Sequence, residues 1–287
     1  MNRWIIGARP RTLPAAVVPV AIGGACAVGL DEEVAWWRVA LALIVSLALQ
    51  VGVNYANDYS DGVRGTDDVR VGPARLVASG LAPAPAVKRA AFAAFGVAAV
   101  AGLAVALTTS LWLLVVGVAA IAAGWFYTGG EHPYGYMGLG EAFVFVFFGL
   151  VATVGTTYAA IETITGLSIV MGSAAGALAC ALLVINNLRD IPTDREVGKR
   201  TLAVRLGDRR TRWFYVGLLG LAFVLVGVAA VDRTWVLLVL LSIPLAVAPA
   251  KQVLGGGTGP ALIGVLGETG RLQLVFGALA TVGLVLG

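Results

Sequence analysis

Long apolar runs recur along nearly the whole chain and constrain its fold more than any other feature. Of the 287 residues, 59% are hydrophobic and only 13% are charged, and the mean hydropathy is +0.90. A helix of about 20 apolar residues is long enough to cross a bilayer. We therefore predict an all-α integral membrane protein with a single transmembrane domain over residues 1–287. Its nine predicted membrane-spanning helices are 12–30, 36–57, 86–108, 110–128, 139–161, 165–188, 211–231, 234–253 and 271–287.

The basic residues predict how these helices are oriented. If the amino terminus lies inside, all Lys and Arg residues except Arg38 and Arg233 fall on the cytoplasmic side, where membrane proteins concentrate them. The net charge of +4 is then a sign of topology rather than of nucleic-acid binding. The first apolar run is too long for a signal peptide and no targeting extension precedes it. We therefore expect a bacterial plasma membrane, several passes and a cytoplasmic amino terminus.

Two polar clusters interrupt the apolar runs. NYANDYSDGVRGTDD, from Asn54 to Asp68, follows the second predicted helix, and NNLRDIPTDREVGKR, from Asn186 to Arg200, follows the sixth. Because these two helices run in the same direction, both clusters are expected at the cytoplasmic face. Acidic and basic loop residues are often only solvated ion pairs. Carboxylates near membrane depth are costly, however, and two similar clusters at one face favour a functional site.

Spacing within the clusters brings oxygen-bearing side chains together. Residues four positions apart are neighbours on a helix face. The pairs are Asn54 with Asp58, Asn57 with Asp61, Asn186 with Asp190, and Asp190 with Asp194. Pro192 predicts that the helix unwinds from about Ile191 onward. Asp67 and Asp68 are interpreted equally as support for a site or as solvated loop residues.

Oxygen ligands that are few and divided between two segments suit Mg²⁺, which commonly shares its coordination with substrate phosphates. Zinc would require His or Cys, and the chain has one His and two Cys, Cys26 and Cys180, both within apolar runs. Several basic residues near the carboxylates are candidates for binding phosphate oxygens. They are Arg64, Arg70, Arg75, Arg189, Arg195, Lys199 and Arg200.

A third polar segment, YTGGEHPYGYMGLGE, extends from Tyr127 to Glu141. Its aromatic residues among glycines either cover a cavity against water or anchor the chain at the membrane boundary. His132, the single imidazole, is either a general acid/base, a phosphate contact or a solvated loop residue.

These stretches resemble the UbiA superfamily of intramembrane prenyltransferases, whose two Asp-rich motifs have the forms NxxxDxxxD and DxxxD. Asn57 and Asp61 match the first two positions of one motif, and Asp190 and Asp194 match the other. Gly65 occupies the third position of the first motif, and Asp67 or Asp68 would take over the role of the aspartate that the motif has there. Four stretches resemble most closely the branch that prenylates 1,4-dihydroxy-2-naphthoate in menaquinone synthesis: WIIGARPRTLPAAVVPV, NYANDYSDGVRGTDD with RVGPARLVASG, PYGYMGLGEAFVFVFFG and NNLRDIPTDREVGKRTLAVRLG.

The resemblance implies nine helices around a central cavity that opens sideways for a lipid tail, with Mg²⁺ between the Asp-rich motifs. The implied reaction transfers a polyprenyl group from polyprenyl diphosphate to 1,4-dihydroxy-2-naphthoate. It releases CO₂ and diphosphate and gives demethylmenaquinone. The implied partners are these two substrates and membrane lipid.

On this interpretation, three groups of side chains share the work. The metal ligands would be Asp58, Asp61, Asp190 and Asp194, oriented by Asn54, Asn57 and Asn186. The diphosphate contacts would be Arg75, Arg189, Lys199 and Arg200. Tyr127, Tyr134 and Tyr136 would shelter the prenyl cation, and His132 or a carboxylate would accept the proton of the ring hydroxyl.

Three alternatives stay open. One is the same chemistry on another aromatic acceptor, such as 4-hydroxybenzoate, homogentisate or a tetrapyrrole. Another is a secondary transporter, although such proteins keep their acids near the bilayer midplane within inverted repeats. A structural scaffold would give the acidic clusters no task. The sequence leaves the prenyl length, the number of metal ions and the oligomeric state open.

Overall fold

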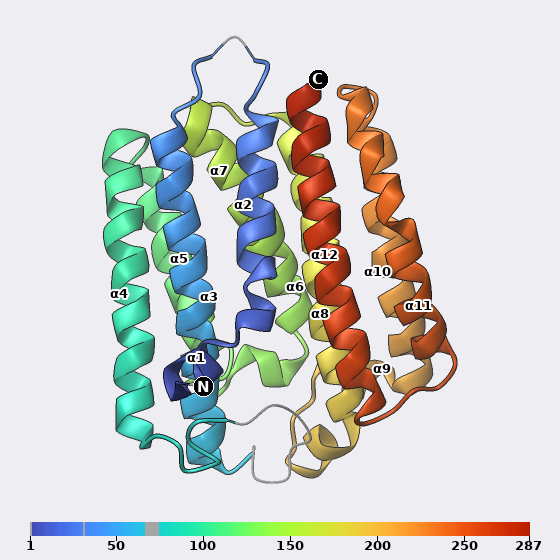
Figure 1. The fold of residues 1–287 in the computed structure, drawn as a ribbon. Coiled ribbons are helices and arrows are strands. Elements are labelled where there is room, and N and C mark those ends of the chain that lie inside the picture. The colour runs from blue at the N-terminus through green and yellow to red at the C-terminus, as the bar shows by residue number, and fades with distance from the viewer. Residues whose placement is uncertain (1, 31, 67–74) are drawn as a thin grey trace.

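The computed structural model describes residues 2–30, 32–66 and 75–287, and all regular structure within them is helical. Long helices stand side by side in a bundle, and the short helices α1 and α9 lie at its lower end in this view (Figure 1). The first half contains α1 (Arg3–Ala8), η1 (Pro10–Thr12), α2 (Pro14–Cys26), α3 (Trp36–Arg64), α4 (Ala84–Thr108) and α5 (Trp112–Phe126). The second half contains η2 (Tyr134–Met137), α6 (Gly140–Val144), η3 (Phe145–Val151), α7 (Ala152–Ile161), α8 (Gly166–Glu196), α9 (Leu202–Leu206), α10 (Asp208–Ala229), η4 (Thr234–Ser242), α11 (Ile243–Leu254) and α12 (Ala261–Leu286).

Several of these helices are suited to a bilayer. Within the described residues, seven are long and apolar enough to cross one, counting α6, η3 and α7 as one helix and η4 with α11 as another. An eighth results if the bent pair Arg3–Thr12 and Pro14–Cys26 is a single span. Helix α5, with 15 residues, is shorter than a usual span. The chain is thus a multi-pass membrane protein, and the count of nine spans stays a prediction.

The predicted helix bounds differ most from the structure at α8 and α12. Helix α8 continues through Pro192 to Glu196, because a proline removes only one backbone hydrogen bond and a helix can continue beyond it. The expected unwinding from Ile191 therefore does not occur. Helix α12 begins at Ala261, well before the predicted start at residue 271.

Helix α8 is the centre of the bundle. It is apolar around most of its circumference, and 78% of its apolar window is buried, compared with 28% for α3. A helix that is hydrophobic on all sides belongs in the interior. Small residues allow close packing around it, since a Cβ atom added to Gly149 of η3 would lie only 2.5 Å from the Cα atom of Gly176.

The polar residues of the sequence collect at one end of this bundle. Helices α3 and α8 both terminate there, as does the amino-terminal α1 (Figure 1). The Tyr55 hydroxyl of α3 donates to the main-chain oxygen of Trp4 at 2.7 Å and holds α1 against that end. The two arginines expected outside lie at the opposite end: Arg38 pairs with Glu162 at 2.7 Å, and Arg233 donates to the oxygen of Val28 at 2.7 Å.

Candidate active site

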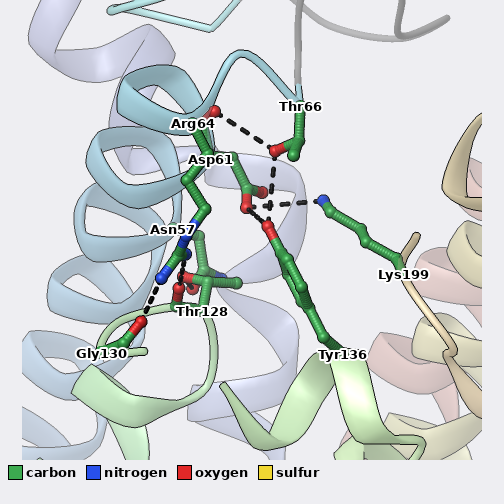
Figure 2. A network of polar contacts seen from close by, with 8 residues as sticks. All are labelled: Asn57, Asp61, Arg64, Thr66, Thr128, Gly130, Tyr136 and Lys199. Carbon is green, nitrogen blue, oxygen red and sulfur yellow. Dashed lines mark hydrogen bonds and ion pairs between the residues drawn. The ribbon is translucent and has the colours of Figure 1, made fainter. Parts of the chain in front are cut away.

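Asp61 lies on the last turn of α3, and its carboxylate is nearly fully buried. The Tyr136 hydroxyl donates to its Oδ1 atom at 2.6 Å, and the Lys199 ammonium is 3.4 Å from the same oxygen (Figure 2). The Lys199 nitrogen also lies 4.6 Å from the centre of the Tyr136 ring, within range of a cation–π interaction. Residues from three separate segments therefore converge on one carboxylate.

The helix stops soon after Asp61 for a local reason. Gly65, at φ 70°, adopts the left-handed conformation that ends many helices and that glycine reaches without steric cost. Its N–H points back to the main-chain oxygens of Asp61 and Gly62. The residue that departs from the expected Asp-rich motif is therefore the cap of α3.

The segment between α5 and η2 is fastened to the same turn of α3. The Thr128 hydroxyl donates to Oδ1 of Asn57 at 2.8 Å. The Arg64 guanidinium donates to the main-chain oxygens of Thr128 and Gly130 (Figure 2). Asn57 and Arg64 thus hold the aromatic loop close to Asp61.

The end of α8 supplies the opposing carboxylates. Asp190 and Asp194 are buried, and Arg189 forms a two-pronged pair with Asp190, with N···O distances of 2.6 and 2.7 Å. Asn186 lies one turn before Asp190 and donates to the main-chain oxygen of Leu182 at 3.4 Å. Because α8 remains helical past Pro192, Asn186, Asp190 and Asp194 keep the spacing of four that puts them on one face.

A cavity of about 480 Å³ lies between the α3 and α8 faces. Its polar end is lined by Asn54, Asn57, Asp61, Arg75, Asn186, Asn187, Asp190, Asp194 and Lys199. The remaining wall is mostly apolar and comes from α3, α4, α5, η3 and α7. Representative residues are Ala42, Leu49, Leu103, Leu113, Ile121, Phe147, Val151 and Gly155. A single cavity therefore joins the polar end to an apolar channel among the helices.

The three predicted tyrosines also line this cavity. The Tyr134 ring stacks on Phe143 with centroids 3.9 Å apart, and the Tyr127 ring meets Tyr134 edge-on at 5.5 Å. The Tyr134 hydroxyl donates to the oxygen of Ala123 at 2.8 Å. Burial, reinforced by the charge of Asp61, raises the pKa of Tyr136 well above its ordinary value. Tyr136 therefore stays protonated at neutral pH and keeps donating to Asp61.

Four predicted site residues are not among those that line the cavity. Asp58 is fully buried on another side of α3, where its carboxylate accepts from the N–H groups of Leu76 and Val77 at 2.8 and 3.0 Å. Arg189 is folded against Asp190. Arg200 is exposed and contributes its main-chain N–H to the oxygen of Tyr136, and His132 is exposed on the loop. The structure thus does not support contact of these four with a molecule in the cavity.

Sequence reasoning also missed polar residues that the fold brings close. Asn187 lines the cavity next to the predicted Asn186, and its amide donates to buried Glu141 at 2.9 Å. Thr12 reaches the cavity and accepts from Asn54 at 3.0 Å. The adjacent asparagines of NNLRD were the only available signal for Asn187. Asp67, Asp68 and Arg70 lie outside the residues that the structure describes.

The side-chain atoms that could bind a metal ion at the polar end of the cavity are oxygens. Within the described parts of the chain, no three His, Cys, Asp or Glu side chains gather into a metal site of their own. A protein cage for zinc is therefore not formed by these residues. Carboxylates presented from two facing helices fit Mg²⁺, which typically takes one or two carboxylates and completes its shell with water and substrate phosphate.

Residues 16–285 match the UbiA prenyltransferase family. The chain belongs to the UbiA prenyltransferase family. It is 52% identical to the 1,4-dihydroxy-2-naphthoate octaprenyltransferase of Mycobacterium tuberculosis, over 98% of this chain and 96% of the relative. It is 37% identical to the Escherichia coli protein of the same name, over 88% of this chain and 84% of the relative. Membership of a family of prenyltransferases removes the support for a transporter or a scaffold.

Solved UbiA structures share the fold. A UbiA homologue from Aeropyrum pernix K1 superposes with a TM-score of 0.71 at 16% identity, over 96% of this chain and 97% of that one. A homologue from Archaeoglobus fulgidus, solved bound to GPP and Mg²⁺, superposes with a TM-score of 0.65 at 16% identity and covers 99% of each chain. The predicted all-helical, UbiA-like fold is confirmed.

Proposed function

We propose that this protein transfers a polyprenyl group from polyprenyl diphosphate to 1,4-dihydroxy-2-naphthoate, with release of CO₂ and diphosphate, to give demethylmenaquinone. The observation that carries the proposal is the single cavity, which joins carboxylates from two facing helices to an apolar channel. A polyprenyl diphosphate is divided in the same way as the cavity, because it has a charged diphosphate at one end and a long apolar hydrocarbon chain. The full-length identity to proteins named for this acceptor supports the choice of substrate.

The polar end of the cavity would hold the diphosphate and its metal. Asp61 on α3 and Asp190 and Asp194 on α8 are the proposed Mg²⁺ ligands, with the amides of Asn57 and Asn186 beside them. When bound, Mg²⁺ would offset the negative charge that develops on the departing diphosphate. Arg75 and Lys199 line the same end and are our choice for direct contacts to its oxygens.

The neighbouring residues would hold the reacting centre in place. Lys199 and Tyr136 both bind Asp61, which fixes the direction of its carboxylate. Tyr127, Tyr134 and Phe143 present aromatic surfaces that exclude water from the allylic carbon while the ring carbon of the acceptor approaches it. The apolar channel would accept the tail without recognising individual groups along it.

The orientation in the membrane follows from the basic residues. Most Lys and Arg side chains belong to the end of the bundle where α3 and α8 terminate, and we propose that this end and the amino terminus face the cytoplasm of a bacterial plasma membrane. Soluble diphosphate would then leave on the cytoplasmic side.

A direct test is to incubate membranes that contain the protein with a polyprenyl diphosphate and one aromatic acid at a time, with and without Mg²⁺. We expect a prenylated product and CO₂ release only with 1,4-dihydroxy-2-naphthoate, and only when Mg²⁺ is present. Prenylation of 4-hydroxybenzoate or homogentisate, without prenylation of the naphthoate, would overturn the assignment of the acceptor. Equal activity after chelation would overturn the assignment of the metal.

A further inference from the structure

Glu141 is a buried acid that the proposed chemistry leaves without a task. It lies in α6, is only 5% exposed, and forms no ion pair with any Lys or Arg among the described residues. Its Oε2 atom is buried and has no hydrogen-bonding partner within that part of the chain. An acid held inside a membrane bundle without a counter-charge is costly, and such residues are usually retained for function.

A side-chain partner of the Glu141 carboxyl connects it to the cavity. Asn187 of α8 donates from Nδ2 to Oε1 of Glu141 at 2.9 Å, and Asn187 itself lines the cavity. This bond fixes which end of the amide faces Glu141, so the Oδ1 acceptor is turned elsewhere. Asn187 also lies three residues before Asp190, on a neighbouring part of the same helix face. Its amide therefore lies at the same polar end of the cavity, but it is not one of the proposed metal ligands or diphosphate contacts.

Aromatic side chains that line the same cavity lie close to Gly140, the residue before Glu141. The Tyr127 ring lies close to the main chain next to Glu141, because a Cβ atom added to Gly140 would lie 3.2 Å from its Cε2 atom. Tyr127 meets Tyr134 edge-on, Tyr134 stacks on Phe143, and all three line the cavity. An aromatic surface with an oriented hydrogen-bond acceptor beside it is suited to a planar ring that carries a hydroxyl group.

We infer that Glu141 is a positioning residue for the aromatic acceptor: it orients the Asn187 amide so that Oδ1 accepts a hydrogen bond from a ring hydroxyl of the substrate. The inference rests on the proposed function, which supplies a hydroxylated aromatic acid as acceptor. Glu141 does not touch the substrate and acts through Asn187. The aromatic surface of Tyr127, Tyr134 and Phe143 would determine where the ring lies, and the amide would determine how it is turned.

The test compares Glu141→Ala, Asn187→Ala, their double variant and Glu141→Gln. For each, the KM of the aromatic acid and the KM of the polyprenyl diphosphate are measured separately. Loss of one hydrogen bond, worth about 1.4 kcal/mol, corresponds to about a 10-fold change in affinity. We expect both alanine variants to raise the KM of the acid about 10-fold and to leave the KM of the diphosphate nearly unchanged. The double variant should be no worse than either single one, because both remove the same contact.

Glu141→Gln preserves an oxygen that accepts from Asn187, and it should behave like the unchanged protein. Cys180→Ala is the matched control, because the Cys180 thiol donates to the main-chain oxygen of Glu141 at 3.1 Å and leaves the carboxyl–amide bond untouched. Its KM values should not change. Thermal unfolding in detergent reports whether each variant remains folded.

Three results would overturn the inference: equal changes in both KM values, independent effects of the two alanine variants, or a Glu141→Gln variant as impaired as Glu141→Ala. Binding of 1,4-dihydroxy-2-naphthoate, followed by the fluorescence of its naphthalene ring, separates this inference from the proposed function. If the protein binds the acid but transfers nothing to it, the proposed function fails. The inference still stands or falls on whether Glu141→Ala weakens that binding about 10-fold.

Discussion

Asp58 and Asp61 are three residues apart on α3, yet their carboxylates do different things. Asp61 reaches the cavity and meets Tyr136 and Lys199. Asp58 accepts from two backbone N–H groups, those of Leu76 and Val77. The latter contact anchors the chain directly after Arg75, a residue that lines the cavity. The sequence motif thus combines a residue of the proposed site with one that holds the neighbouring backbone.

Substitution should separate these two roles. Asp58→Ala removes two hydrogen bonds to a charged group and leaves two buried N–H groups unmatched, which should lower the free energy of unfolding by about 3 kcal/mol. Asp61→Asn should remain folded and lower kcat about 100-fold, because it removes a charge from the proposed metal site. Thermal unfolding and single-turnover assays on both variants measure this. A stable, inactive Asp58→Ala variant would show that Asp58 acts in the reaction itself.

Tyr136 gives a second prediction at this scale, which concerns pH. Its raised pKa means that the hydroxyl remains protonated above the ordinary tyrosine value near 10. The bond to Asp61 should therefore persist from neutral pH through about pH 9. Tyr136→Phe should lower kcat about 10-fold, the effect of losing one hydrogen bond to a charged group. The size of that loss should not vary with pH between 7 and 9; a loss that disappears at pH 9 would show that Tyr136 ionises.

At the scale of helices, glycine residues form part of the wall of the apolar channel and leave it wider than larger side chains would. Gly102 of α4, Gly117 of α5 and Gly155 of α7 line the cavity. A Cβ atom added to Gly117 or Gly155 would have no neighbour within 4 Å. These positions face open space among the helices, where the proposed prenyl tail would lie.

Filling that space should discriminate among tails. Gly155→Leu is expected to raise the KM of a long polyprenyl diphosphate about 10-fold, because the leucine would occupy space that the bound tail needs, and overpacking costs about 1–3 kcal/mol. A short allylic diphosphate, which needs less of the channel, should be affected little. Gly227→Leu is the control, since Gly227 is exposed on α10, outside the residues lining the cavity, and an added Cβ atom there also meets nothing within 4 Å. Equal effects of the two variants on both donors would contradict a tail-binding channel.

The sequence predicted the helices better than the directions of their side chains. Apolar runs and the spacing of four placed Asn57, Asp61, Asn186, Asp190 and Asp194 correctly along α3 and α8. The partner of Asp58 could not be predicted, because Leu76 and Val77 reach it only after the chain has turned back. Glu141 was expected at the start of the helix predicted over 139–161, but its burial could not be predicted, because that burial depends on α8 lying against α6.

For the whole molecule, the central feature is that α3 and α8 present their carboxylates to one cavity without forming a metal site on their own. On the proposed function, the diphosphate would supply the remaining oxygen ligands of a Mg²⁺ ion that these carboxylates hold. The apolar channel continues from that point between the helices. Donor and metal should therefore bind cooperatively, each raising the affinity for the other by the same factor.

The most direct measurement is the equilibrium binding of an unreactive prenyl thiolodiphosphate to the purified protein, titrated with and without Mg²⁺. We predict that Mg²⁺ strengthens binding at least 10-fold, and that Asp61→Asn on α3 and Asp194→Asn on α8 each abolish this gain while the protein stays folded. If binding is equally strong without a divalent cation, or if both variants keep the full gain, the two helices do not hold a metal–diphosphate complex between them.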